Sequence, residues 1–195
     1  MRKLKVVLVG EESAGIQALK LVGCKGHEVV AVIASAAAAI NQGACLHDVA
    51  QKLGYRVWPT HLVDDAAFAD TIRVEAADIL LNVHSLKIIH ERVLTAPTIG
   101  CFNLHPGPLP RYAGLNAVNW AIYRGENQHG VTIHRMNAVV DAGTIAYQEL
   151  FPIEDSDNGL SVSSKCTRLG LALLEKLLDA AATDPASIPA RAPRA

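Results

Sequence analysis

Short apolar runs alternate along the chain with longer segments in which apolar residues recur at helical spacing. Residues 4–9 (LKVVLV) and 29–33 (VVAVI) are typical of parallel strands that are covered on both faces. Residues 161–182 are typical of an amphipathic helix, with leucines 169, 173, 174 and 177 on one face. These patterns predict strands at 4–9, 29–33, 55–58, 79–83 and 100–104, and helices at 12–22, 43–53, 66–76, 114–123 and 161–182.

Two later segments, 131–136 and 144–150, alternate enough to predict antiparallel strands at one end of the sheet. The order of strands and helices predicts an α/β fold: a doubly wound, mostly parallel sheet with helices on both faces and an antiparallel edge. Ligands of such sheets bind beyond the carboxyl ends of the strands. We therefore expect the chemistry of this protein in the segments after Val9, Val83 and Leu104.

The chain divides into a predicted domain, residues 1–182, and an Ala- and Pro-rich tail or linker, residues 183–195. The last segment (TDPASIPARAPRA) has no apolar period, and its composition is typical of an interdomain linker or a frayed terminus. We expect it to lie unpacked.

Composition and charge narrow the class of protein. Half of the residues are hydrophobic (50%), which suits a chain with a full core. The formal net charge of −1 argues against a nucleic-acid-binding protein that works through a broad basic surface. No run approaches the roughly 18 apolar residues of a membrane span, and the N-terminus lacks a signal sequence. We expect a cytoplasmic protein with no nucleic-acid or membrane partner.

The cysteines and histidines do not predict a metal site. The four cysteines lie far apart without a CxxC pair, and the eight histidines form no H-x-x-x-H pattern. Reduced, partly buried thiols are expected. His134 is predicted to be packed or edge-exposed on its strand rather than a ligand, and the following are expected at the surface: His27, His47, His61, His90 and His129.

The turn after the first strand, Gly10 to Gly15 (GEESAG), matches three known motifs only in part. It lacks the second glycine of a dinucleotide fingerprint, the Lys of a P-loop and the first glycine of a nucleophile elbow. Glu11 and Glu12 would also repel a phosphate at the start of the helix. An acidic N-terminal capping turn is one interpretation of this segment, and one wall of an acceptor pocket is the other.

The segment 101–114 (CFNLHPGPLPRYAG) offers the strongest chemical signal. Asn103 and His105 are two apart at the end of a strand, so their side chains share a face. Asp141 follows in a turn between two strands. An amide, an imidazole and a carboxylate without an activated Ser or Cys suggest direct attack on a carbonyl, whose oxyanion the first two would stabilise. From residue types alone, purely structural roles remain the favoured alternative.

Three motifs that follow one another along the chain favour the catalytic interpretation over the structural one. FNLHPGPLPRYAG at 102–114, GVTIH at 130–134 and VDAGTI at 140–145 resemble the folate-dependent formyltransferase family, over roughly residues 5–178. The resemblance implies that Asn103, His105 and Asp141 are catalytic, that 10-formyltetrahydrofolate is the formyl donor and that the bond before Pro110 is cis. Gly107 stands where many relatives have Ser.

The resemblance also implies a donor pocket and an amine acceptor. The pterin would lie between two walls, the first formed by Leu86, Lys87, Ile88 and Ile89, and the second by Asn137, Ala138, Val139 and Val140. The acceptor would be a carrier-bound aminoacyl group, an amino sugar or another small amine, and further domains of a larger biosynthetic protein are possible partners. A hydrolase that uses water as acceptor and a non-catalytic folate-binding module stay open as alternatives.

Overall fold

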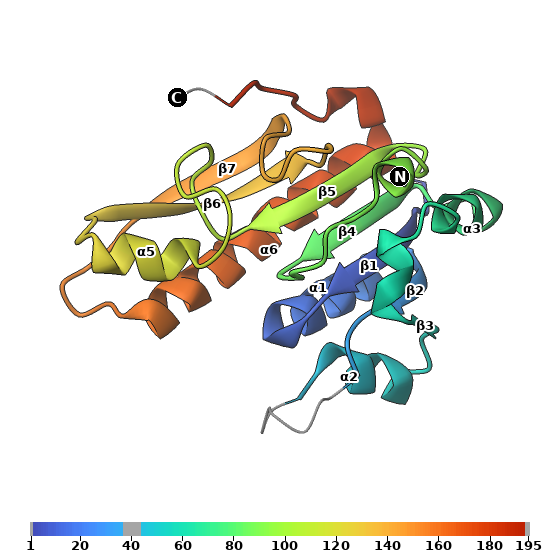
Figure 1. Cartoon of the computed structure of the whole chain (residues 1–195), viewed down its shortest axis with the longest axis horizontal. Coiled ribbons are helices and arrows are strands. Elements are labelled where there is room, and N and C mark those ends of the chain that lie inside the picture. The colour runs from blue at the N-terminus through green and yellow to red at the C-terminus, as the bar shows by residue number, and fades with distance from the viewer. Residues whose placement is uncertain (1, 37–43, 194–195) are drawn as a thin grey trace.

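A single twisted sheet organises the chain, of which the computed structural model describes residues 2–36 and 44–193. The sheet has seven strands in the order β3-β2-β1-β4-β5-β6-β7 (Figure 1). Its strands are β1 (Lys5–Gly10), β2 (Glu28–Ile33), β3 (Val57–Trp58), β4 (Ile79–Val83), β5 (Gly100–His105), β6 (Gln128–Arg135) and β7 (Ile145–Pro152). Strands β1 to β5 pair in parallel, and β6 and β7 pair antiparallel. The predicted fold class, including its antiparallel edge, is confirmed.

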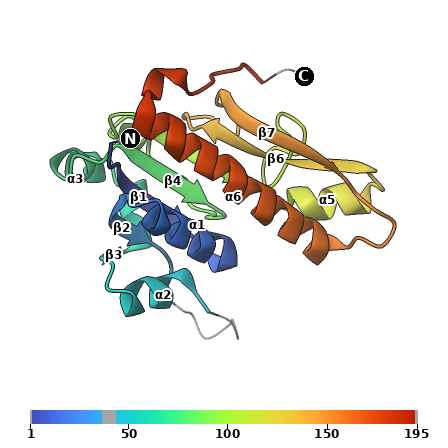
Figure 2. The same ribbon diagram turned by 180° about the vertical axis from the view of Figure 1, so that it is seen from behind.

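Helices cover both faces of the sheet. They are α1 (Glu12–Cys24), α2 (Leu46–Lys52), α3 (Phe68–Val74), α4 (Glu91–Leu94), α5 (Ala117–Tyr123) and α6 (Gly159–Thr183), with short 3-10 helices η1 (Thr60–Asp64) and η2 (Pro185–Ser187). Seen from behind, α1 and α6 cross one face of the sheet (Figure 2). Within the described residues, no helix is long and apolar enough to cross a membrane.

The continuous apolar run of β1 serves both layers of the core. Val6 and Leu8 pack in the cluster that contains residues of α1 and α6, whereas Val7 and Val9 pack in the cluster that contains residues of α3 and α4. Successive side chains of a strand point to opposite faces. A strand buried on both faces therefore needs apolar residues at every position, as the sequence has here.

Several element boundaries differ from those predicted. The helix expected at 114–123 begins only at Ala117, because Asn116 has a left-handed backbone (φ 58°). The helix expected at 43–53 spans Leu46–Lys52, and residue 43 lies outside the described residues. Helix α4 and η1 have four and five residues, too few to produce a recognisable apolar period.

The C-terminal segment corrects the expectation of an unpacked tail. Asp184 caps η2, since its Oδ1 accepts a hydrogen bond from the Ala186 N–H at 3.0 Å. Ile188 is only 7% exposed and joins the core cluster of α6. Arg191 pairs with Ile145 at the start of β7 through two backbone hydrogen bonds of 2.8 and 3.0 Å. A buried isoleucine, a capped 3-10 turn and a backbone pairing with β7 together dock this segment. The domain boundary at 182/183 stays a prediction.

Candidate active site

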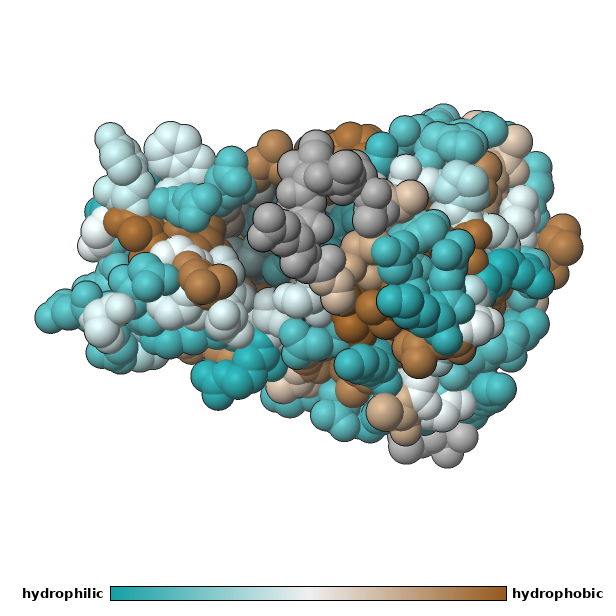
Figure 3. All heavy atoms as spheres, turned by 90° about the horizontal axis from the view of Figure 1, so that it is seen from below, coloured by the Kyte–Doolittle hydropathy of each residue, from teal (hydrophilic) through white to brown (hydrophobic). Residues whose placement is uncertain are grey.

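A cavity of about 1120 Å³ opens at the carboxyl ends of β1, β4 and β5, where the order of strands predicts a ligand. Viewed from below, this side of the molecule is hollowed, and brown apolar side chains lie among teal polar ones (Figure 3). The cavity lining contains every site residue predicted from the sequence: Asn103, His105, Asp141, Leu86, Lys87, Ile88, Ile89, Asn137, Ala138, Val139 and Val140.

A row of polar side chains crosses three neighbouring strands at the floor of the cavity. Asn103 of β5 pairs in register with Asn82 of β4 on one side and with His134 of β6 on the other. Asn82 Nδ2 donates to Asn103 Oδ1 at 3.2 Å, and Asn103 Nδ2 lies 3.1 Å from His134 Nε2. The amide of Asn103 is therefore held from both sides by the register of the sheet.

Asp141 joins this row from the loop between β6 and β7. Its Oδ1 lies 3.3 Å from His134 Nε2 and 3.4 Å from Asn103 Nδ2. Its Oδ2 accepts the Gly114 N–H at 2.8 Å. Burial alone would raise the pKa of Asp141, but the hydrogen bond with His134, the charge of His105 and the Gly114 N–H together lower it below its usual range. Asp141 is therefore a carboxylate at neutral pH.

His105 is buried at the end of β5 between two acceptors. Its Nδ1 lies 3.4 Å from Asp141 Oδ2, and its Nε2 lies 2.7 Å from the carbonyl oxygen of Tyr112. Burial lowers the pKa of His105, while Asp141 and the Tyr112 carbonyl oppose that shift. Because both ring nitrogens face acceptors, the doubly protonated ring satisfies both contacts.

Gly143 fixes the loop that carries Asp141. A Cβ added at this position would overlap the carbonyl oxygen of Arg135. The backbone of residue 143 therefore packs directly on the end of β6, two residues after the carboxylate. This close approach anchors Asp141 beside His134.

The two predicted donor walls expose apolar side chains. Leu86 and Ile88 of the first wall are 77% and 66% exposed, and Val139 and Val140 of the second are 65% and 57% exposed. Apolar side chains that line a cavity while remaining this exposed offer a surface for a flat, partly apolar ligand.

Charged and hydroxyl side chains complete the lining of the cavity. Glu11 and Glu12 follow β1, and Ser163, Thr167 and Arg168 belong to α6. Glu11 is the N-cap residue of α1 and Glu12 lies in its first turn, so the turn is acidic, but the Glu11 side chain makes no capping hydrogen bond: its Oε1 accepts hydrogen bonds from the N–H and hydroxyl of Ser35 at 3.0 and 2.7 Å. The interpretation of this turn as a cavity wall agrees with the structure.

Sequence reasoning missed part of the cluster. His134, expected to be packed or edge-exposed on its strand, is packed, and it also contacts both Asn103 and Asp141, whereas Asn82 was not singled out at all. Both could be found only from the strand register. His129, expected at the surface, is fully buried, with Nε2 3.0 Å from the carbonyl oxygen of Pro106. Its position on β6 faces the 106–112 loop, which the sequence alone does not place.

The cysteines are free thiols, as expected, and Cys101 and Cys166 are buried. Burial raises the pKa of each of these two thiols to about 12. Away from the cavity floor, Cys45, His47 and Asp48 each bring one potential metal-ligand atom within 4.8 Å of the others. The spacing of cysteines and histidines in the sequence did not predict this cluster.

The backbone of the 106–114 loop also follows the sequence-based expectation. The peptide bond between Leu109 and Pro110 is cis, as the resemblance implied. The loop passes over the end of β5, where Thr132 donates a hydrogen bond to the Gly107 carbonyl at 2.7 Å.

Comparison with known proteins places the chain in a family. Residues 4–177 match the family model described as formyl transferase. The methionyl-tRNA formyltransferase of Ehrlichia canis (strain Jake) is 33% identical over 184 residues, which cover 90% of this chain and 60% of that protein. That of Ehrlichia ruminantium (strain Welgevonden) is 31% identical over 182 residues, with the same two coverages, 90% and 60%. The chain thus spans about 60% of the length of these curated relatives.

Solved structures share the fold at lower identity. The N-formyltransferase from Helicobacter canadensis, in complex with folinic acid and dTDP-3-aminofucose, superposes with a TM-score of 0.78 at 18% identity and covers 98% of this chain and 68% of that one. Glycinamide ribonucleotide transformylase 1 from Symbiobacterium toebii gives a TM-score of 0.77 at 20% identity and covers 98% of this chain and 95% of that one. With the family model matching nearly the whole chain, this protein belongs to the formyl transferase family.

Proposed function

We propose that this protein transfers a formyl group from 10-formyltetrahydrofolate to an amine. The observation that carries the proposal is the convergence of Asn103, His105 and Asp141 at the floor of one cavity. Membership of the formyl transferase family supports the same chemistry.

The cavity suits a folate donor. Solved relatives are described with folinic acid or with 5-N-formyl-THF. In this chain, the walls 86–89 and 137–140 would hold the flat pterin between their exposed apolar side chains, with backbone groups to bond its polar edge. The bound donor would supply a formyl carbonyl that an amine can attack.

Asn103 is suited to stabilise the charge that develops on the formyl oxygen as an N–H donor, and the His105 ring through its positive charge, because Asp141 and Tyr112 occupy its two ring nitrogens. When an amine attacks a carbonyl, negative charge builds on the oxygen, and fixed N–H donors in a water-poor site lower that barrier most effectively. Asn103 is held in place by its neighbours across the sheet, and the His105 ring is held by Asp141 and Tyr112.

Asp141 would act on the charge of His105 and on the proton of the attacking amine. A carboxylate at this position favours the protonated form of His105 and is a base for the proton that the attacking amine loses. Glu11 and Glu12, on the far wall, would attract a cationic amine before it is deprotonated. The acceptor we favour is a carrier-bound aminoacyl group or an amino sugar.

The test is a direct assay of the purified protein. It is incubated with 10-formyltetrahydrofolate and one acceptor at a time: a nucleotide-linked amino sugar, an aminoacyl carrier protein and methionyl-tRNA. Tetrahydrofolate release is followed by absorbance and the product by mass spectrometry, with His105→Ala as the matched control. Acceptor-dependent formylation that His105→Ala abolishes supports the proposal. Formate release without any amine would instead identify a hydrolase, and donor binding without turnover would identify a binding module.

A further inference from the structure

The loop of residues 111–114, here called the Tyr112 loop, contacts both members of the His105–Asp141 pair through its backbone. The Tyr112 carbonyl oxygen lies 2.7 Å from His105 Nε2, and the Gly114 N–H donates to Asp141 Oδ2 at 2.8 Å. We infer that the Tyr112 loop is the positioning element of this pair, and that the absence of a side chain at Gly107 lets the His105 ring reach the Tyr112 carbonyl. This inference rests on the proposed function.

The backbone of Tyr112 adopts a left-handed conformation, which directs its carbonyl oxygen toward His105. Its φ is 60°, in the left-handed region that residues with a Cβ adopt only when their surroundings enforce it. The phenol supplies that enforcement by donating to Glu126 Oε1 at 2.5 Å, and Arg111 donates to the same oxygen at 2.6 Å. Glu126 therefore fixes the loop from its outer side.

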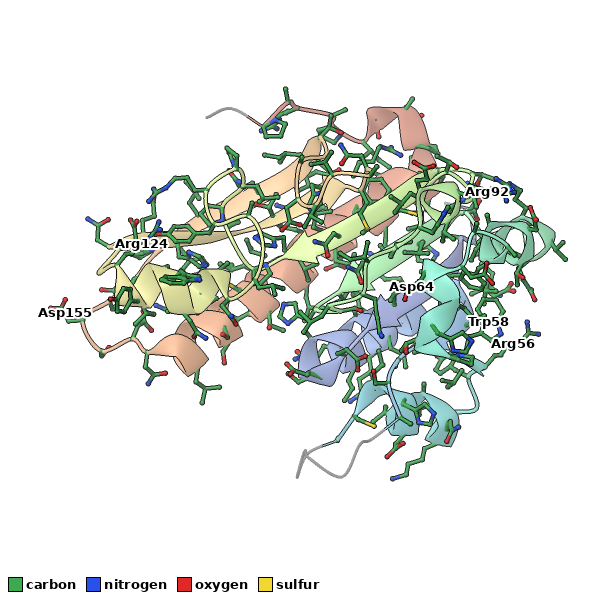
Figure 4. All side chains as sticks on the ribbon, viewed as in Figure 1. Arg56, Trp58, Asp64, Arg92, Arg124 and Asp155 are labelled. Carbon is green, nitrogen blue, oxygen red and sulfur yellow. The ribbon has the colours of Figure 1, made fainter. Side chains whose placement is uncertain are left out.

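The Tyr112 ring is also packed on several sides. It meets His129 edge to face, with 5.6 Å between ring centroids, and the Arg124 guanidinium lies 5.6 Å from its centroid. Arg124 lies at the α5 end of the molecule (Figure 4). These contacts couple the half-buried Tyr112 side chain to Glu126 and β6, and through it the backbone that faces His105.

Gly107 leaves the space that the imidazole occupies. A Cβ added at this position would lie 2.7 Å from His105 Nε2 and 3.1 Å from the Tyr112 carbonyl oxygen. A separation of 2.7 Å between a methyl carbon and a ring nitrogen is well inside van der Waals contact. Any side chain at position 107 must therefore push the ring away from the Tyr112 carbonyl.

The contact has a consequence for the charge of His105. The Tyr112 carbonyl and the Asp141 carboxylate accept from the two ring nitrogens and so favour the protonated ring. The titratable groups that oppose or modulate this charge are the neighbouring imidazoles of His84, His129 and His134. Weakening the Tyr112 contact should therefore lower the pKa of His105.

The experiment compares variants of the Tyr112–Glu126 hydrogen bond, here called the anchor, with a control substitution at another tyrosine. Tyr112→Phe and Glu126→Ala remove the anchoring hydrogen bond, and Glu126→Gln keeps an acceptor oxygen for the phenol. Tyr123→Phe is the control, because this tyrosine of α5 is 81% exposed. The pKa of His105 is measured by NMR titration of its ring protons, alongside kcat, the Kd of 10-formyltetrahydrofolate and thermal unfolding.

We expect Tyr112→Phe and Glu126→Ala to lower the pKa of His105 and to reduce kcat about 5- to 10-fold, the effect of one weakened hydrogen bond, with the donor Kd unchanged. Glu126→Gln should recover most of the loss, and Tyr123→Phe should behave as wild type. Gly107→Ala should lower the His105 pKa further. An unchanged pKa and kcat in both anchor variants, or an equal loss in Tyr123→Phe, would overturn the inference.

The readouts separate this inference from the proposed function. If the wild-type protein shows no formyl transfer with any acceptor, the proposed function fails, while the His105 pKa still tests the positioning role. If transfer occurs and the anchor variants leave both pKa and kcat unchanged, only the positioning role fails. If Gly107→Ala does not fold, the two anchor variants decide the question.

Discussion

Replacing Ile188 by Ala tests whether the C-terminal segment is part of the packed domain. The substitution removes three carbons from a side chain that is 7% exposed. At about 0.8 kcal/mol for each buried methylene, the loss is roughly 2.4 kcal/mol before any cavity is counted. Ile188 lies on a short terminal segment between η2 and the pairing of Arg191 with Ile145, and this segment can shift to close part of the space, so the cavity contribution is small.

The expected destabilisation is therefore about 2–3 kcal/mol, or a fall of roughly 5–10 °C in Tm for a domain of this size. Urea unfolding followed by circular dichroism and a thermal scan measure both quantities. Ala190→Ser, an exposed position of the same segment, is the control and should change stability by less than about 0.5 kcal/mol. A Tm for Ile188→Ala within about 1 °C of wild type would refute the packing and favour the unpacked tail expected from composition.

The remaining predictions concern the cavity. Asn103→Ala should lower the formyl transfer rate about 100-fold with the fold retained, as loss of a donor to a developing oxyanion does, and steady-state kinetics with circular dichroism check it. Replacing Glu11 and Glu12 with Gln should raise the KM of the acceptor and spare the donor Kd; the reverse pattern would exchange the two pockets. Asp141→Asn removes the charge that raises the pKa of His105, so an NMR titration should find the protonated ring lost at lower pH than in wild type. A pKa that rises instead would show that Asp141 does not stabilise the imidazolium.

The fold could be predicted from the sequence because its buried strands are continuous apolar runs. Val6 to Val9 alternate between the two core clusters, a pattern that neither a helix nor a half-exposed strand would need. Likewise, Asn103 and His105 lie two apart on one strand, so their shared face follows from local geometry alone. Asp141, by contrast, lies 36 positions beyond His105, so no local geometry joins the two, and the resemblance to a family was needed to favour its catalytic role over a structural one.

What the sequence could not supply is the register between strands and the path of loops. His134 lies beside Asn103 because β5 and β6 pair at that position, and no local pattern encodes this pairing. His129 looked like a surface residue beside polar neighbours, but the 106–112 loop covers it. Ile188 lies among Ala and Pro residues, whose composition hides a single apolar anchor.

The contact of Gly143 with the Arg135 carbonyl has a genetic consequence. Every missense change of a glycine codon introduces a Cβ, and here no Cβ fits. Position 143 should therefore tolerate no amino-acid exchange, although it lines neither wall of the donor pocket. Residues 137–140 are exposed, so a side chain can change there without such a clash. A substitution in that wall would therefore alter how a ligand is held while the neighbouring carboxylate stays where it is.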